Sequence, residues 1–346
     1  MKYTFLPSTN IKVSKICLGT MTFGNQNSEK EGFDQMDLAT DMGINFIDTA
    51  ELYPVPATAE LYADTEKIIG KWMSKKNNRD QIVLATKIAG PGDYTKHIRT
   101  TGFTKSALSS AVDESLKRLK TDYIDLYQLH WPERKVPRFG ELDYKYDPND
   151  NVWTTVEEVL YNLNELVKSG KIRYVGLSNE TPWGMMKFLE VAKEKNFPRM
   201  MSIQNVYSLV NRVFDIGHSE VSMAENLGLL AYSPLAGGRL SGKYIGGINP
   251  KNARYTLWPR RFSRHHTERG EKAIDKYVSL ANKYEIPPST FANAFVNDRP
   301  FVTSNIIGAT TMDQLKENID SIDIQLTDEM HSDIEEVHLT NPNPCV

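Results

Sequence analysis

The chain has 346 residues, of which 40% are hydrophobic and 25% charged, an ordinary composition for a globular protein with a full apolar core. Its formal net charge of -3 gives no reason to expect a nucleic-acid-binding surface. Two cysteines exclude a disulfide framework and favour a reducing compartment. With no recognisable signal peptide or membrane-length apolar run, we expect a cytoplasmic protein without a membrane partner.

A short hairpin is predicted first. Residues 3–6 and 11–13 form two candidate strands joined by residues 7–10, ahead of any regular alternation of strands and helices. We expect this hairpin to plug one end of the structure.

Apolar, β-branched runs then alternate with amphipathic segments, which favours parallel strands joined by helical crossovers. Thr104, Thr155 and Thr181 each precede a segment with helical apolar spacing and can cap that helix. Eight strands are the number that closes a barrel around a packed interior, so the prediction is an α/β protein with a (β/α)8 TIM barrel as one domain over residues 1–346. The eight predicted strands are residues 16–19, 45–48, 82–87, 124–130, 173–178, 201–205, 229–233 and 305–308.

Two long loops interrupt the alternation. Residues 133–152 follow the fourth barrel strand, and residues 236–266, with seven arginine or lysine residues, follow the seventh. Long loops in compact domains are usually lids or binding elements, so we expect both to border a functional site.

Four polar residues stand at or just beyond the ends of three early strands. Asp48 ends one strand, Tyr53 follows it, and Lys87 and His130 end the next two. The carboxyl ends of barrel strands meet at one mouth, so we expect these side chains to lie together. Taken singly, a strand-end lysine is more often a solvated cap, a tyrosine amphipathic core and a histidine a satisfied buried group.

Together the four residues would make a proton donor for a carbonyl. Free tyrosine, with a pKa of about 10, is a weak acid at neutral pH. A lysine ammonium about 4 Å away would stabilise the phenolate by about 4 kcal/mol at an effective dielectric near 20, so Lys87 is expected to lower the pKa of Tyr53. Asp48 would keep Lys87 charged, and His130 would donate to the carbonyl oxygen.

The same segments resemble the aldo-keto reductase superfamily. Residues 46–53, the Lys87 strand and residues 122–132 carry the resemblance, as do residues 18–24 and 170–179. The chain is most similar to the bacterial Tas-type branch, near the potassium-channel β-subunit-like reductases, on residues 21–29 and 52–56. The resemblance implies a TIM barrel, NADPH bound without a Rossmann domain, and reversible reduction of aldehydes or ketones by the same four residues. Pro54 departs from the glycine often found there, which puts the pocket shape in doubt.

A cofactor cradle is expected at the later strand ends, since no Gly-x-Gly-x-x-Gly follows an early strand. Polar groups there could bond a carboxamide, glycines allow close phosphate approach, and two cations would suit a 2′-phosphate. Without the resemblance, the basic loop could be no more than solvated. The resulting cofactor-binding candidates are Ser178, Asn179, Gln204, Tyr232, Ser233, Pro234, Leu235, Gly238, Leu240, Lys243, Arg254, Gly308, Ala309, Thr310, Gln314, Glu317 and Asn318. The resemblance implies that the loop from Ser233 to Lys243 clasps the pyrophosphate, and it also implies the contacts of Gly308 to Thr310, Gln314 and Asn318.

Two other functions compete with an NADPH-dependent reductase of small carbonyl substrates. One is an NADPH-binding regulatory or redox-sensing module with slow turnover. The other is a Schiff-base aldolase with Lys87 as nucleophile, which ranks last because a lysine paired with Asp48 stays protonated. The histidines lack the spacing of metal ligands, so no metal is expected. The oligomeric state and the substrate stay open.

Overall fold

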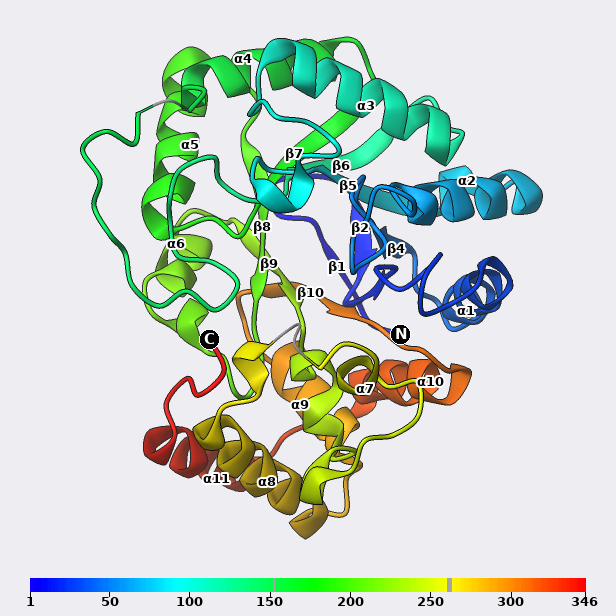
Figure 1. Ribbon diagram of the computed structural model, residues 1–346, viewed down its shortest axis with the longest axis vertical. Coiled ribbons are helices and arrows are strands. Elements are labelled where there is room, and N and C mark those ends of the chain that lie inside the picture. Colours follow the sequence, from blue (N-terminus) through cyan, green and yellow to red (C-terminus); the bar gives the residue numbers. More distant parts are fainter. Residues whose placement is uncertain (152, 260–262) are drawn as a thin grey trace.

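Eight parallel strands form a closed barrel with helices around it in the computed structural model, which describes residues 1–151, 153–259 and 263–346 (Figure 1). Val152, the last residue of the first predicted loop, and residues 260–262 of the second lie outside the described residues. The strands follow one another around the barrel in the order β10-β3-β4-β5-β6-β7-β8-β9. The predicted (β/α)8 barrel is confirmed.

All eight predicted strands are present, with bounds that differ from the expected ones by three residues or fewer. They are β3 (Ile16–Gly19), β4 (Phe46–Asp48), β5 (Val83–Ile88), β6 (Ile124–Leu129), β7 (Ile172–Ser178), β8 (Met200–Val206), β9 (Gly228–Tyr232) and β10 (Val302–Ile307). The largest difference is in β10, which begins at Val302 instead of Asn305 because the chain already pairs with β9 there.

The helices begin where the capping residues indicate. The hydroxyls of Thr104, Thr155 and Thr181 each accept a hydrogen bond from the amide three residues further along, which confirms the three predicted caps. The described α-helices are α1 (Glu29–Asp41), α2 (Asp64–Lys76), α3 (Lys105–Leu119), α4 (Val156–Lys168), α5 (Pro182–Lys195), α6 (His218–Ala224), α7 (Arg254–Leu257), α8 (Glu268–Lys283), α9 (Pro288–Asn297), α10 (Met312–Asp320) and α11 (Asp328–Thr340). Within the described part of the chain, no helix combines the length and apolar character needed to cross a membrane.

Alternation along the strands divides the barrel interior into an apolar lower part and a polar upper part. In β5, Val83 and Ala85 belong to a buried apolar cluster, and Lys87 is the next residue of the same face. In β6, Leu126 belongs to that cluster and Gln128 follows it toward the mouth. Period-two spacing therefore carries the polar residues to the carboxyl end of the barrel.

The N-terminal hairpin closes the opposite end, as expected. β1 (Tyr3–Phe5) and β2 (Lys12–Ser14) pair antiparallel, and the hairpin residues Leu6, Ile11 and Val13 join the apolar cluster inside the barrel. Asn45, just before β4, holds the hairpin through its side chain, which accepts from the amide of Ser14 at 2.7 Å and donates to the carbonyl of Lys12 at 2.8 Å.

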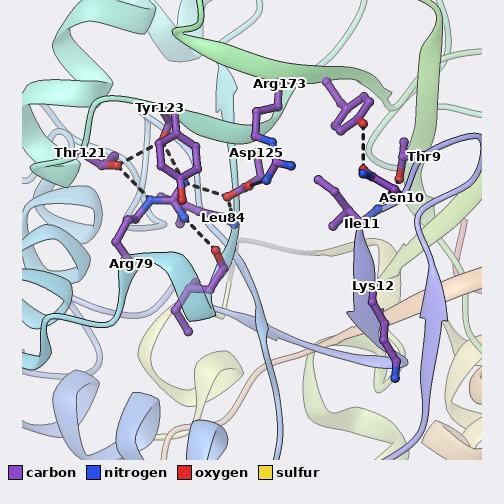
Figure 2. Close-up of polar contacts among 12 residues, drawn as sticks. Thr9, Asn10, Ile11, Lys12, Arg79, Leu84, Thr121, Tyr123, Asp125 and Arg173 are labelled. Atoms are coloured by element: carbon purple, nitrogen blue, oxygen red, sulfur yellow. Dashed lines mark hydrogen bonds and ion pairs between the residues drawn. The ribbon is translucent and has the colours of Figure 1, made fainter.

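A buried carboxylate ties the strand starts together beside this hairpin (Figure 2). Asp125 accepts from Arg79 and Arg173 at 2.8 Å each and from the amide of Leu84 at 2.9 Å. A polar pocket of about 260 Å³ lies between these residues and the hairpin. This is the end of a TIM barrel where polar networks serve stability.

The two long loops meet above the mouth. The first runs between β6 and α4, and the second, between β9 and α8, contains α7 and the 3-10 helices η4 (Ala236–Ser241), η5 (Ile245–Gly247) and η6 (Ser263–His265). A Cβ placed on Gly140 would lie 3.3 Å from the Cβ of Arg264 and 3.4 Å from the carbonyl of Val346. The first loop therefore rests on the second and on the last residue of the chain.

Candidate active site

The structure brings the four residues of the predicted tetrad together at the barrel mouth. Lys87 is fully buried, and its ammonium donates to Asp48 at 2.6 Å and to the carbonyl of Thr49 at 2.7 Å. The same nitrogen lies 5.0 Å from the ring centroid of Tyr53. The His130 ring lies 5.8 Å from the ring of Tyr53, centroid to centroid, in an edge-to-face arrangement.

Two glutamines fix the carboxylate of Asp48. The second oxygen of Asp48 accepts from Gln204 at 2.9 Å and from Gln128 at 3.2 Å, and the two amides also bond each other at 3.2 Å. Gln128 was not among the sequence candidates, although it lies two residues before His130 and therefore on the same inward face. The predicted role of Gln204 in carboxamide binding competes with this bond, because its amide nitrogen is directed at Asp48.

Burial is the largest influence on the pKa of the Tyr53 phenol. The pKa of Tyr53 is raised well above its usual value, first by burial and then by the negative charge of Asp48. Arg254 is the cation that opposes this rise, and the expectation that Lys87 lowers the pKa of Tyr53 stays a prediction. At neutral pH Tyr53 carries its proton.

His130 is neutral for a related reason. Burial and the nearby charge of Lys87 hold the pKa of the imidazole well below its usual value. A neutral imidazole has one N–H donor and one acceptor nitrogen. Among the described residues, Nδ1 of His130 is buried without a hydrogen-bond partner.

Apolar side chains surround the phenol on the side of the first loop. Leu52 and Trp131 are buried in a cluster that also includes Tyr53. Trp131 donates from Nε1 to the carbonyl of Pro91 at 3.0 Å, and Phe139 of the first loop packs edge-to-face on its indole at 5.9 Å.

A polar shelf lies at the ends of β7, β8 and β9. The hydroxyl of Tyr232 donates to the side-chain oxygen of Asn179 at 2.7 Å, and the amide nitrogen of Asn179 donates to the carbonyl of His130 at 2.9 Å. Ser178 donates to the carbonyl of Gln204 at 2.8 Å. The four predicted nicotinamide contacts are therefore linked by hydrogen bonds, and Asn179 connects them to the backbone of His130.

The loop after β9 is folded tightly around one carbonyl. The amides of Gly238 and Leu240 both donate to the carbonyl of Leu235, at 2.8 and 3.2 Å. Gly238 has a φ of 97°, a conformation that favours glycine. The predicted contacts Ser233 and Pro234 lead directly into this turn, and the carbonyl of Ser233 accepts from the amide of Ala236 at 2.9 Å.

Two cations of the second loop lie close to this turn. The ammonium of Lys243 is 3.1 Å from where a Cβ of Gly238 would be, and it lies over the ring of Tyr244. Burial and the charge of Arg254 lower the pKa of Lys243, and burial also lowers the pKa of Arg254. An anion such as a phosphate would relieve the repulsion that Arg254 exerts on the charged form of Lys243.

The segment after β10 is held from below by α10. Gln314 accepts from the amide and the hydroxyl of Thr310 at 3.0 Å each, and Asn318 donates to the carbonyl of Gly308 at 3.2 Å. Ala309 accepts from the side chain of Gln35, and Glu317 accepts from Ser289. The side chains expected to bond adenine thus shape the backbone of this segment, and their contact with a cofactor stays a prediction.

These features fit a dinucleotide. A Cβ added to Gly308 would meet no atom within 4 Å, so the backbone there is open to close approach by a ligand. Gly308 and the glycine turn of the second loop follow neighbouring strands of the barrel. An open backbone, a tight glycine turn and two adjacent cations are the surroundings that a pyrophosphate and a further phosphate need.

Comparisons with known proteins agree with this architecture. The model of the aldo/keto reductase family matches residues 15–338, and the chain belongs to this family. It is 44% identical to Protein tas of Escherichia coli over 347 residues, covering 100% of both chains. It is 34% identical to the uncharacterized oxidoreductase YrpG of Bacillus subtilis, over 95% of this chain and 94% of the relative. Norsolorinic acid reductase A of Aspergillus parasiticus is 28% identical over 95% of this chain and 79% of its own length. Membership makes the chain a carbonyl-reducing oxidoreductase that uses a nicotinamide cofactor.

Proposed function

We propose that this chain is an NADPH-dependent reductase that converts small aldehydes or ketones to alcohols, with Tyr53 as the general acid. The observation that carries the proposal is a protonated, partly buried phenol next to both a neutral imidazole and a buried ammonium. When bound, the nicotinamide supplies a hydride to the carbonyl carbon.

The phenol supplies the matching proton. Because burial keeps Tyr53 protonated, it can donate to the substrate oxygen as negative charge develops there. Lys87, which donates to Asp48 and lies beside the ring of Tyr53, stabilises the phenolate left behind. His130 donates its N–H to the same oxygen and orients the carbonyl, which its neutral state allows.

The cofactor preference rests on Lys243 and Arg254. The charge of Arg254 disfavours the charged form of Lys243 in a partly buried loop, which favours a ligand with an additional phosphate, the group that distinguishes NADPH from NADH. Neither Thr310 nor Thr311 offers a charge at the end of β10, so discrimination depends on these two cations.

Replacement of the phenol tests the reaction. Tyr53→Phe should reduce turnover of 4-nitrobenzaldehyde by about 10²-fold or more, while the NADPH dissociation constant, measured by fluorescence, changes less than about two-fold. Tyr127→Phe is the control, because this tyrosine is buried, is not one of the four tetrad residues, and its hydroxyl has no partner among the described residues. Full activity in Tyr53→Phe would remove Tyr53 from the mechanism. Tight NADPH binding without turnover by the unaltered protein would favour the regulatory module.

A further inference from the structure

Glu51, between Asp48 and Tyr53 in the sequence, extends the pairing of β4 with β5 beyond the strand ends. Its side chain is 0% exposed. Its amide donates to the carbonyl of Lys87 at 3.2 Å, and its carboxylate accepts from the amide of Ala89 at 2.5 Å. Glu51 thus holds the segment leading to Tyr53 against the end of the strand that carries Lys87.

Arg99 forms a bidentate ion pair with this carboxylate. Both terminal nitrogens of Arg99 bond the carboxylate of Glu51, one of them at 2.8 Å, and one also donates to the carbonyl of Ala89 at 3.4 Å. The arginine side chain is only 12% exposed. A fixed guanidinium fork orients a carboxylate more strictly than a single charge does.

The loop from Ala89 to Arg99 also reaches the other half of the site. The carbonyl of Pro91 accepts from the indole of Trp131, the residue after His130, and a Cβ on Gly90 would lie 2.2 Å from that indole nitrogen. Tyr94 accepts from the amide of Ala57, four residues beyond Tyr53. One loop therefore contacts both the segment of the phenol and the segment of the imidazole.

We propose that Arg99 is a positioning residue, which sets the phenol of Tyr53 relative to Lys87 and His130 through Glu51 and the loop from Ala89 to Arg99. The inference rests on the proposed function, since it assigns Arg99 to the geometry of that reaction. Arg99 itself contacts none of the reacting groups in the described structure.

A second buried pair provides the control. Glu66 and Arg118 are 0% and 11% exposed, close to the 0% and 12% of Glu51 and Arg99, and they bond at 2.6 Å between α2 and α3. Among the described residues, Arg118 donates to Glu66 and Ser115, and Glu66 also accepts from Thr86; none of these partners lies in residues 49–57 or 89–99. Arg99→Met and Arg118→Met should therefore lower the free energy of unfolding by similar amounts, whereas only Arg99→Met should lower kcat.

The experiment compares Arg99→Met, Arg99→Lys and Arg118→Met with the unaltered protein. Arg99→Met should lower kcat for 4-nitrobenzaldehyde by about 10²-fold with a small change in KM, because misplaced reacting groups slow the chemical step. Arg99→Lys should recover part of the loss, and Arg118→Met should retain kcat. Hydrogen exchange of the cofactor-free chain should be faster over residues 49–57 and 85–95 in Arg99→Met only.

These variants separate the positioning role of Arg99 from the proposed function. Unchanged kcat in Arg99→Met, or an equal loss in Arg118→Met, would overturn the positioning role. If the unaltered protein does not reduce aldehydes, the proposed function fails, and exchange over residues 49–57 still decides whether Arg99 orders the segment of Tyr53. Unchanged exchange there would overturn the inference on its own.

Discussion

Removing one partner of the buried Asp48–Lys87 pair should cost more stability than removing both. The charged atoms are 2.6 Å apart, and the two side chains are 3% and 0% exposed. At an effective dielectric of about 20 their attraction is about 6 kcal/mol, which offsets a desolvation cost of several kcal/mol for each ion. Asp48→Asn or Lys87→Met alone leaves one buried charge uncompensated and should lose about 3–5 kcal/mol.

The double variant separates stability from catalysis. Asp48→Asn combined with Lys87→Met should regain most of the lost stability because no charge remains, whereas turnover stays lost because no ammonium faces Tyr53. Urea unfolding followed by tryptophan fluorescence gives the four free energies of the cycle, and NADPH consumption with an aldehyde gives turnover in the same samples. Losses below about 1 kcal/mol in both single variants would refute a buried ion pair. Turnover in the double variant would refute the role of Lys87.

Three further results are expected. Gly308→Ala should leave the thermal midpoint unchanged, since the added Cβ meets open space, but raise the NADPH dissociation constant several-fold; unaltered affinity would place the cofactor elsewhere. Lys243→Ala should weaken NADPH much more than NADH in fluorescence titrations, and equal losses would exclude a 2′-phosphate contact. The pKa values of His130 and His265 are lowered by burial, so below about pH 6.5 the unfolded chain binds more protons than the folded chain. Unfolding free energy should therefore fall as the pH is lowered through this range, by about 1.4 kcal/mol per pH unit for each histidine, and urea midpoints at pH 7.5 and 5.5 that agree would contradict this.

The barrel and the grouping of its polar residues could be predicted from the sequence because both follow from local periodicity. Val83, Ala85 and Lys87 alternate with outward residues, so the last of them has to emerge at the mouth. Parallel topology then brings Asp48 and His130 to the same end. Register and topology together leave little freedom at these positions.

Contacts between distant segments could not be predicted in this way. Arg99 lies 48 positions from Glu51 in a stretch without regular periodicity, so nothing local indicates their pairing. The raised pKa of Tyr53 depends on burial by several elements, which a pairwise argument from Lys87 leaves out. The contact of Asn318 with a ligand stays a prediction, whereas its bonds to Gly308 and Asn293 join segments that no local pattern brings together.

The apolar filling of the lower barrel has a consequence for the return of a proton to Tyr53 after each reaction. Cys17, Ala85 and Leu126 pack beneath the polar layer, and the hairpin seals the strand starts below them. No chain of polar side chains leads through these packed residues toward the hairpin. Water at the barrel mouth is therefore the route by which a proton can return to Tyr53. In the proposed reaction, the carbonyl substrate, the alcohol product and the proton that restores Tyr53 would therefore all pass through the mouth of the barrel.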